Sequence, residues 1–336
     1  MNFISGATGL VGSYLCRFLI GKGETIVALK RKTSKLDLLG DAATKIDWID
    51  GDLLDIDLLL EATKDCKYIY HCAALVAYHK KMQSQLMQVN VIGTKNIVNV
   101  ALHNNIHKVV HVSSIAALGA GVKSKLIDED ISADKWNSAY GLSKHLAELE
   151  IFRGNVEGLK SVIINPSVIL GAGYWSKNSG KLFVHADKNF PYYSNGSTGY
   201  VDVRDVVNIM HQLMHKDIFN ERFIVNSQNF SFKDILTKIA VLLNRKPPKI
   251  LAGFFLQNIA LITDYLKSVL SNKESLLTKE LIRAANCTHL YNNAKITDIL
   301  NYSFIPISTS LKEIAASFEN SKAKNTSFGL LPLTKI

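Results

Sequence analysis

The chain has 336 residues, of which 47% are apolar and 20% charged, and its formal net charge is +10. This composition is typical of a folded globular protein and excludes a disordered chain. Lysines are spread along the whole sequence with one short basic cluster at residues 30–32, which indicates a solvated basic surface rather than a nucleic-acid groove. The length favours one large domain and a smaller one.

Cysteine usage and the apolar runs indicate the compartment. Cys16, Cys66, Cys72 and Cys287 show no Cys-x-x-Cys spacing and fit reduced thiols. The chain opens on "MNFISGATGL", without the pattern of a signal peptide. The longest apolar run, residues 250–262, contains two amides and is too short to span a bilayer. We therefore predict a cytoplasmic protein without stable membrane insertion. Residues 250–262 are interpreted as a buried or lid helix, with contact to a membrane surface as the alternative.

Short apolar runs alternate with amphipathic stretches through the first half of the chain. We predict strands at residues 2–5, 25–29, 46–49, 68–71, 108–113 and 161–165. We predict helices between them at residues 10–22, 53–63, 87–104 and 138–153. Strands that alternate with long helices form strand-helix-strand units, so the pattern predicts an α/β protein with a parallel sheet.

The pattern changes after about residue 170. Glycine and aromatic residues gather in "GAGYWSKNSGK" and "NFPYYSNGSTGY", and two further helices are predicted near residues 231–243 and 278–285. We predict that residues 1–170 form one domain and that residues 171–325 form a smaller, mostly helical substrate-binding domain. Parts of residues 200–228 are expected to return to the first domain. The tail "NSKAKNTSFGLLPLTKI" is predicted to pack loosely or fray.

A glycine-rich loop separates the first strand from the first helix. In "FISGATGLVGSYL", Gly6, Gly9 and Gly12 have the spacing Gly-x-x-Gly-x-x-Gly. Glycine lets the chain turn sharply and lets backbone amides approach a pyrophosphate, while the helix N-terminus adds a favourable dipole. This placement predicts dinucleotide binding by the loop. Besides the glycines, the loop residues expected to contact the cofactor are Thr8, Leu10 and Val11.

The residues after the second strand indicate which dinucleotide is bound. An acid normally stands there and binds the adenosine ribose of NAD. Here the sequence reads "ALKRKTSK", with no acid before Asp37. Arginine can bind a 2′-phosphate through two hydrogen bonds, so Arg31, Lys32 and Lys35 favour NADP(H) over NAD(H). The alternative is a solvated basic loop.

An acidic segment lies at the end of the third predicted strand. In "DGDLLD", Asp52 can accept a hydrogen bond from the adenine amino group, with Leu53 beside it. A helix-capping role for Asp52 is the competing interpretation.

A series of motifs in a fixed order gives the sequence a family resemblance. After the glycine loop come "GDLLD", "HCAA", "VNVIGTKNI", "VSSIAALG", "YGLSK", "NPSVILGAG" and "YVDVRDVV". In this order the sequence resembles the extended short-chain dehydrogenase/reductase family, part of the NAD-dependent epimerase/dehydratase superfamily. Within it the chain looks most similar to the branch of dihydroflavonol reductases and hydroxysteroid dehydrogenase-like proteins. The resemblance implies a Rossmann-type doubly wound parallel sheet.

The resemblance also implies three catalytic residues. Family members use a tyrosine, a lysine four residues later and an upstream serine or threonine. The matching residues are Tyr140 and Lys144 in "YGLSK", and Ser114 in "VSSIAALG", with Ser113 as the reserve. Hydride transfer to a carbonyl creates an alkoxide, which needs a proton as its charge develops. We predict that Tyr140 supplies that proton, that Lys144 lowers the tyrosine pKa, and that Ser114 hydrogen-bonds the substrate oxygen. Lys144 is also expected to hold the nicotinamide ribose.

Other residues match family positions near the cofactor. Asn90 matches a polar position that supports the active site, with a helix-kinking contact as the alternative. Asp202 and Arg204 are expected to tie the two domains together. The remaining positions expected at the cofactor are Ala73, Ala74, Asn165, Pro166 and Val168.

Five histidines raise the question of a metal: His71, His79, His111, His185 and His211. We assign none of them a partner at a ligand spacing such as His-x-x-x-His with a nearby acid, and we therefore expect no catalytic metal.

Three functions fit the sequence. The favoured one is an NADP(H)-dependent reductase of a ketone or aldehyde, or the reverse dehydrogenase, acting on a fairly apolar small molecule. The aromatic residues expected to wall its pocket are Tyr174, Trp175, Phe183, Phe190, Tyr192 and Tyr193. The alternatives are a nucleotide-sugar epimerase or dehydratase with tightly bound NAD, and a non-catalytic NADP(H) sensor. The family suggests a homodimer through the helices at residues 87–104 and 138–153.

Overall fold

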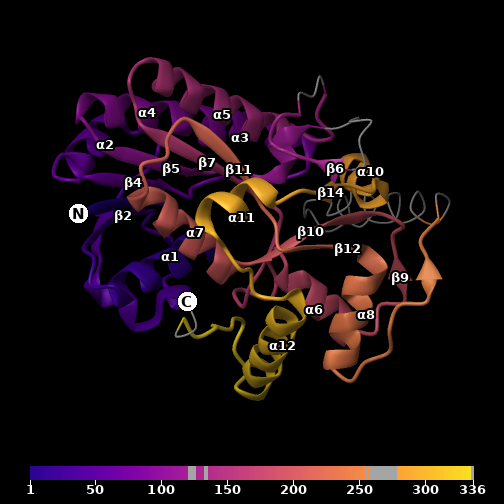
Figure 1. Ribbon diagram of the computed structural model, residues 1–336. Helices are drawn as coiled ribbons and strands as arrows, with labels where there is room; N and C mark the ends of the chain where they lie inside the picture. The colour runs from indigo at the N-terminus through magenta and orange to yellow at the C-terminus, as the bar shows by residue number, and fades with distance from the viewer. Residues whose placement is uncertain (120–125, 132–134, 254–255, 257–277, 334–336) are drawn as a thin grey trace.

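The computed structural model describes residues 1–119, 126–131, 135–253, 256 and 278–333. A parallel seven-stranded sheet runs through it in the order β11-β7-β5-β4-β1-β2-β3 (Figure 1). The strands are β1 (Asn2–Ser5), β2 (Ile26–Lys30), β3 (Asp47–Asp50), β4 (Tyr68–His71), β5 (Lys108–Val112), β7 (Ser161–Pro166) and β11 (Glu221–Val225). The order reverses between β1 and β4, as in a Rossmann-type doubly wound sheet. The predicted fold class is confirmed.

Helices cover both faces of this sheet. The first face carries α2 (Ile56–Thr63), α4 (Gly93–His103) and α5 (Ala139–Val156), and the second carries α1 (Leu10–Gly21) and α7 (Val203–His215) (Figure 1). Successive strand residues point to opposite faces, so Phe3 lies in the first core and Ile4 in the second. Each face thus has its own apolar core, which fixes the strand register.

The six predicted strands are all present, each within one residue of its predicted ends. Helix 53–63 begins later, at Ile56, because the Asp55 carboxylate accepts a hydrogen bond from the Leu58 amide and caps it. Helix 87–104 is not a regular α-helix. It opens with α3 (Gln83–Leu86) and a π-helical turn at Met87–Ile92, and only then becomes α4.

The C-terminal half contains more strand than predicted. A second sheet has the order β12-β10-β8, formed by β8 (Val168–Leu170), β10 (Ser197–Asp202) and β12 (Gln228–Ser231). Two small pairs join β9 (Tyr192–Tyr193) to β13 (Ile250–Leu251), and β6 (Leu126–Ile127) to β14 (Leu290–Tyr291). The helices are α6 (Gly180–Asp187), α8 (Phe232–Leu242), α10 (Lys279–Asn286), α11 (Ala294–Leu300) and α12 (Ile307–Ala323). Helices α8 and α10 match the two predicted helices. The domain division at residue 170 stays a prediction.

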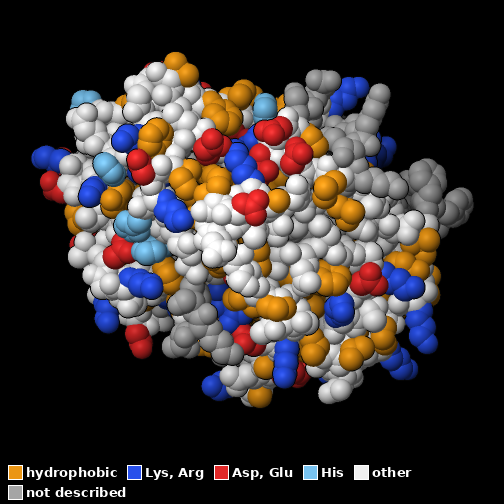
Figure 2. Space-filling model, viewed as in Figure 1, with side chains coloured by type: hydrophobic (Ala, Val, Ile, Leu, Met, Phe, Trp, Pro, Cys, Tyr) orange, Lys and Arg blue, Asp and Glu red, His pale blue; other side chains and the backbone are white. Residues whose placement is uncertain are grey.

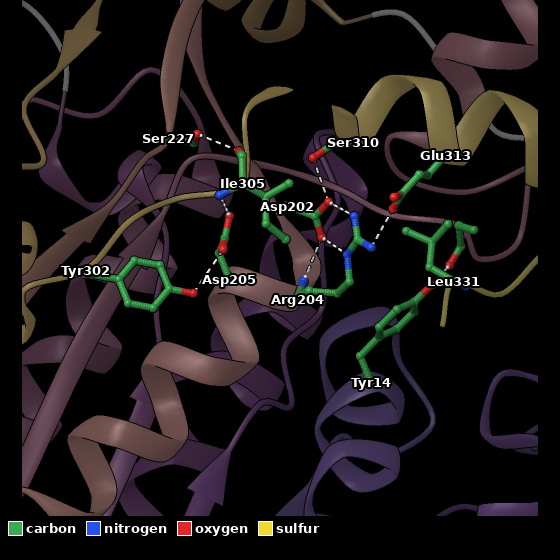
Figure 3. Close-up of polar contacts among 11 residues, drawn as sticks. Tyr14, Asp202, Arg204, Asp205, Ser227, Tyr302, Ile305, Ser310, Glu313 and Leu331 are labelled. Atoms are coloured by element: carbon green, nitrogen blue, oxygen red, sulfur yellow. Dashed lines mark hydrogen bonds and ion pairs between the residues drawn. The ribbon is translucent and has the colours of Figure 1, made fainter. Parts of the chain in front are cut away.

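The prediction of a loose tail is wrong. The Leu331 side chain is 2% exposed. Its amide donates to the Tyr14 hydroxyl over 2.9 Å, and its carbonyl accepts from Arg17 over 2.8 Å. The tail is therefore docked on α1, as Figure 3 shows for Tyr14 and Leu331.

The apolar run at residues 250–262 also differs from its prediction at its start. Ile250 and Leu251 form strand β13 and are 48% and 45% exposed, so they do not begin a buried helix. Most of the run lies outside the described residues. Among the residues that the structure does describe, no helix combines the length and apolar composition needed to cross a bilayer.

A buried ion-pair network joins β10, α7 and α12 (Figure 3). Arg204 is 1% exposed and donates two hydrogen bonds to the fully buried Asp202 carboxylate, at 2.9 and 2.7 Å. It also donates to Glu313 over 2.5 Å. Ser310 of α12 donates to Asp202 over 2.6 Å. These contacts attach the last long helix to the start of α7. The role predicted for Asp202 and Arg204 in tying two domains together stays a prediction.

Asp205, one residue further along α7, gives a testable pH dependence. Burial raises the pKa of Asp205 to about 7, although its carboxylate accepts from the Tyr302 hydroxyl and the Ile305 amide. A raised native pKa means that the folded chain binds more protons than the unfolded chain between about pH 4 and pH 7. The free energy of unfolding should therefore fall as pH rises through this window. We expect this fall in the free energy of unfolding to be on the order of 2–4 kcal/mol, and we expect Asp205→Asn to abolish it.

Urea unfolding of wild type and Asp205→Asn at pH 4 and pH 8 measures this contribution. Groups shared by the two proteins cancel in the difference. A stability difference between wild type and variant that does not change with pH would contradict the assignment.

Candidate active site

The predicted site residues gather at the carboxyl-terminal edge of the main sheet. The glycine loop follows β1, Ala73 follows β4, and Ser114 follows β5. Since β1, β4 and β5 are neighbours and parallel, these three segments meet at one edge. That edge is where ligands bind in open α/β sheets.

The glycine loop fits a pyrophosphate. Gly6 has φ +73°, and a Cβ on it would lie 2.6 Å from the Ala73 nitrogen. A Cβ on Gly12 would lie 2.2 Å from the Gly6 carbonyl oxygen. Helix α1 has no side-chain cap and no acid in its first turn, so its first amides are free of a competing anion. Thr8, Gly9 and Leu10 line a small cavity of about 90 Å³ above it.

A larger cavity of about 650 Å³ lies beyond β2 and β3. Arg31, Asp52 and Lys81 all line it. Lys30, at the end of β2, is paired with Asp50, which leaves Arg31 as the cation of this segment in the cavity. Lys32 and Lys35 are exposed and are not among its lining residues. Asp52 accepts the Leu54 amide over 3.1 Å, and Leu53 is 6% exposed and packs against Gly93.

Close packing of α5 brings Tyr140 to Ser114. A Cβ on Gly141 would lie 2.7 Å from the Ala116 carbonyl, so glycine after the tyrosine lets α5 approach the 3₁₀ turn Ile115–Leu118. The Tyr140 hydroxyl lies close enough to Ser114 for the serine to lower the tyrosine pKa. Ser113, the reserve, donates instead to the fully buried Glu148 over 2.5 Å. The geometry favours Ser114 over Ser113.

Lys144 lies buried one turn after Tyr140. It is 1% exposed, and its ammonium donates to the Val112 carbonyl over 2.9 Å. Burial lowers the pKa of Lys144 to about 8, with Glu148 acting in the opposite direction. The lysine is therefore mainly protonated at neutral pH.

The predicted lowering of the Tyr140 pKa by Lys144 and the oxidised nicotinamide stays a prediction. Burial raises the pKa of Tyr140 above its ordinary value, with Tyr78 adding to the rise and only the nearby Ser114 opposing it. Protein groups alone therefore keep Tyr140 a neutral hydroxyl, which is the form of a proton donor.

Comparisons with known proteins identify the family. The model of the NAD dependent epimerase/dehydratase family matches residues 3–225. The chain belongs to this family. It is an NAD(P)-dependent oxidoreductase of the extended short-chain dehydrogenase/reductase type.

Several relatives show the branch. A Synechocystis sp. protein named as a candidate dihydroflavonol 4-reductase is 32% identical over 257 residues, which cover 74% of each chain. Sterol demethylase protein B of Methylococcus capsulatus is 28% identical over 79% of this chain and 82% of its own length. The crystal structure of gox2253 superposes with a TM-score of 0.81 at 26% identity, covering 95% of this chain and 98% of that chain. The resemblance found in the sequence is confirmed at this level.

The sequence did not reveal that His71, His111 and Glu148 are buried around Lys144. His111 Nε2 lies 3.4 Å from the Lys144 ammonium, and the His71 and His111 rings lie 4.9 Å apart. Burial lowers the pKa of His71 to about 3 and that of His111 well below its ordinary value, so both rings are neutral under Lys144. Glu148 follows Lys144 by four residues on the face that also carries Tyr140. That spacing is the signal that could have revealed it.

Two asparagines organise the same region. Asn90 is 1% exposed, and its amide bonds both backbone groups of Leu75 and the Ser143 hydroxyl. It supports the loop after β4 from within the π-helical turn. Asn165 donates to the Ser114 carbonyl over 2.9 Å and to Glu148 over 2.6 Å, which fixes the backbone at the predicted serine.

Three further predicted positions lie on the same edge. Pro166 ends β7 and Val168 begins β8, so both stand where the main sheet gives way to the second sheet. Ala74 is exposed beside Ala73. Their contacts with the cofactor stay predictions.

The six aromatic residues predicted to wall the substrate pocket fall into three groups. Trp175 and Phe183 are core residues that pack with Phe318, so their assignment to the substrate pocket is wrong. Tyr174 donates to Asp37 over 2.9 Å. The other three, Phe190, Tyr192 and Tyr193, line an apolar pocket of about 210 Å³ with residues of α6 and α8.

The expectation that none of the five histidines has a partner at a ligand spacing is wrong for His211. His215 follows His211 by four residues on α7, so the spacing His-x-x-x-His is present, and Glu24 lies beside both. This group lies away from Ser114, Tyr140 and Lys144, at the opposite edge of the sheet.

Proposed function

We propose that the protein is an NADP(H)-dependent reductase of a ketone or aldehyde in a fairly apolar small molecule, or the dehydrogenase of the corresponding secondary alcohol. The observation that carries the proposal is the pairing of Tyr140 with Ser114, beside a buried Lys144, at the edge that holds the glycine loop.

The residues divide the chemistry among them. The nicotinamide, when bound, supplies the hydride that the carbonyl carbon accepts. Tyr140 gives its hydroxyl proton to the carbonyl oxygen, so one hydride and one proton convert the carbonyl to an alcohol. Ser114 donates a hydrogen bond to the same oxygen as its negative charge develops. The Lys144 ammonium stabilises the phenolate that Tyr140 leaves, and binds the ribose that orients the ring.

The fit of the glycine loop supports a dinucleotide, and Arg31 supports the phosphorylated form. Gly6, Gly9 and Gly12 would hold the pyrophosphate against α1, and Arg31 would bind the 2′-phosphate from the 650 Å³ cavity. Asp52 lines the same cavity and would accept from the adenine amino group. Lys32 and Lys35 do not line this cavity and would add positive charge only from the neighbouring surface.

The competing functions have less support. Residues Ile115 and Ala116 follow Ser114, and neither can remove a proton as a dehydratase requires. An NAD-holding epimerase is disfavoured because Lys30 and Arg31 stand where an acid would bind the ribose. A non-catalytic NADP(H) sensor is disfavoured because cofactor binding without chemistry does not require the buried Tyr140 and Lys144.

Substrate class, assembly and location belong to the same proposal. The pocket lined by Phe190, Tyr192 and Tyr193 suits an apolar group. The homodimer would form through residues 87–104, which include the π-helical turn and α4, and through α5, since Ile92 of the turn is 38% and Leu149 of α5 47% exposed. We place this enzyme in the cytoplasm.

Replacing Arg31 with alanine should weaken NADPH binding about 10- to 100-fold and leave NADH binding unchanged, because the lost hydrogen bonds are made to a charged phosphate. Fluorescence titration of the purified protein with each cofactor measures both dissociation constants. Lys45→Ala removes an exposed cation outside the cavity and serves as the control. Equal NADPH and NADH affinities in wild type would argue against the role of Arg31.

The proposed function has a direct test. The purified protein is denatured to detect any co-purified nucleotide, and then the apo form is titrated with NADPH and NADH. Empty protein with NADPH bound at least tenfold tighter supports a reductase that exchanges its cofactor, and an apolar carbonyl panel follows. Tightly held NAD would refute it and favour an epimerase that recycles the cofactor within each turnover.

A further inference from the structure

Two histidines and a glutamate meet on the face opposite the catalytic edge. His211 and His215 lie one turn apart on α7, and Glu24 lies in the turn between α1 and β2. Glu24 Oε1 lies 2.9 Å from His211 Nε2 and 3.9 Å from His215 Nε2. One ligand atom from each of the three side chains lies within 4.8 Å of the other two. Figure 2 shows histidine side chains gathered beside acidic ones on this face, over the region of β4 and α7.

Neighbouring groups hold the three side chains in place. The Asn2 amide donates to the second Glu24 oxygen over 2.9 Å, so Oε1 is left facing the histidines. Phe18 of α1 contacts the His211 ring edge-to-face at 5.3 Å, and Tyr68 of β4 does the same for His215 at 5.4 Å. The cluster therefore joins three elements that are distant in sequence.

We propose that Glu24, His211 and His215 bind a divalent transition-metal cation of the Zn²⁺ class. Imidazole nitrogens select such cations over Mg²⁺ and Ca²⁺, which prefer oxygen ligands. Ligands of tetrahedral Zn²⁺ lie roughly 2.0–2.2 Å from the metal, and hence about 3.3 Å from one another. The Glu24 oxygen lies 2.9 and 3.9 Å from the two histidine nitrogens, which bracket that value, and the histidine nitrogens lie within 4.8 Å of each other, so side-chain rotations would complete the set.

The site formed by Glu24, His211 and His215 is open to solvent on one side. The His215 side chain is 40% exposed, and those of His211 and Glu24 are each 22% exposed. Three protein ligands and one open position leave room for water. Lys67 and Lys108 act electrostatically on His215 and oppose a cation, so we expect weaker binding than at thiolate zinc sites.

The place of the proposed cation site in the fold determines whether binding changes stability or catalysis. Glu24 immediately precedes β2, whereas Ser114 follows the carboxyl end of β5, so the site and the catalytic residues lie at opposite edges of the parallel sheet. A cation here links the α1–β2 turn to α7, whose other end carries Arg204. Binding should therefore raise the melting temperature and leave the chemistry of Tyr140 unaffected.

Zn²⁺ titration against a chromogenic chelator tests the site, using the tag-free full chain after EDTA dialysis. We expect one equivalent to bind, and we expect His211→Ala, His215→Ala and Glu24→Gln each to weaken it at least tenfold. His103→Ala, which removes an exposed histidine of α4, should bind as wild type does. Zn²⁺ should raise the melting temperature of wild type and of His103→Ala but not of His215→Ala.

Co²⁺ in place of Zn²⁺ separates this site from the four cysteines. Binding without a thiolate charge-transfer band supports the proposal, whereas a strong near-ultraviolet band shows that a thiol holds the metal and overturns it. Unchanged Zn²⁺ affinity in His215→Ala also overturns it, because this half-exposed side chain can be removed without disturbing the core. The cluster would then be a hydrogen-bonded contact between α7 and the α1–β2 turn.

Discussion

Replacing Tyr140 with phenylalanine should lower the turnover number roughly 10²- to 10⁴-fold, the usual contribution of a general acid. The hydroxyl is the group that we propose donates the proton, and burial keeps it neutral until the substrate oxygen becomes basic. The phenylalanine ring keeps the packing of the buried tyrosine, so NADPH affinity should stay within a few-fold of wild type.

Turnover under saturating cofactor and a separate cofactor titration distinguish chemistry from binding in this variant. The matched control is Tyr70→Phe, which removes the hydroxyl of a second buried tyrosine. The Tyr70 hydroxyl makes no hydrogen bond to any residue that the structure describes, so its removal should leave turnover near wild type. A Tyr140→Phe enzyme that works at the wild-type rate on a true substrate would show that another group donates the proton.

Local sequence patterns predicted the first half of the fold because its elements are specified by nearby residues. Most strands from β1 to β7 in the main sheet are short apolar runs, although β3 is flanked by two acids. In the glycine loop, a side chain on Gly6 or Gly12 would collide with neighbouring backbone, so the sequence itself specifies these two positions. Ser114 was placed only by the family resemblance. What the structure adds is the physical distinction from Ser113, whose hydroxyl is taken by Glu148.

Contacts between distant segments could not be derived from the same patterns. The tail looked polar and loose, yet Leu331 is fixed by Tyr14 and Arg17, more than 300 residues earlier in the chain. The aromatic cluster after residue 170 gave no sign of which rings face a pocket, because burial of Trp175 and Phe183 depends on α12. Glu24 and His211 are likewise brought together only by the fold.

Replacing Arg204 with methionine should lower the free energy of unfolding by about 3–5 kcal/mol. Methionine fills much of the same space, but it leaves the fully buried Asp202 carboxylate without its cation (Figure 3). An unpaired buried charge is far more costly than the pair itself is stabilising, because neither water nor a counter-ion replaces the lost partner. Urea or thermal unfolding measures the loss.

Two further variants test whether the stability loss in Arg204→Met comes from the buried unpaired charge or from the loss of ion pairs in general. Arg153 also bonds two carboxylates, Glu150 and Glu157, but its side chain is 33% exposed, so Arg153→Met should cost less than about 1 kcal/mol. The double variant Asp202→Asn/Arg204→Met should recover part of the stability lost in Arg204→Met, since it removes the stranded charge and keeps an oxygen to cap α7. If the double variant is instead less stable than Arg204→Met, the loss comes from the contacts of Arg204 with Glu313 and α12 rather than from the unpaired charge of Asp202.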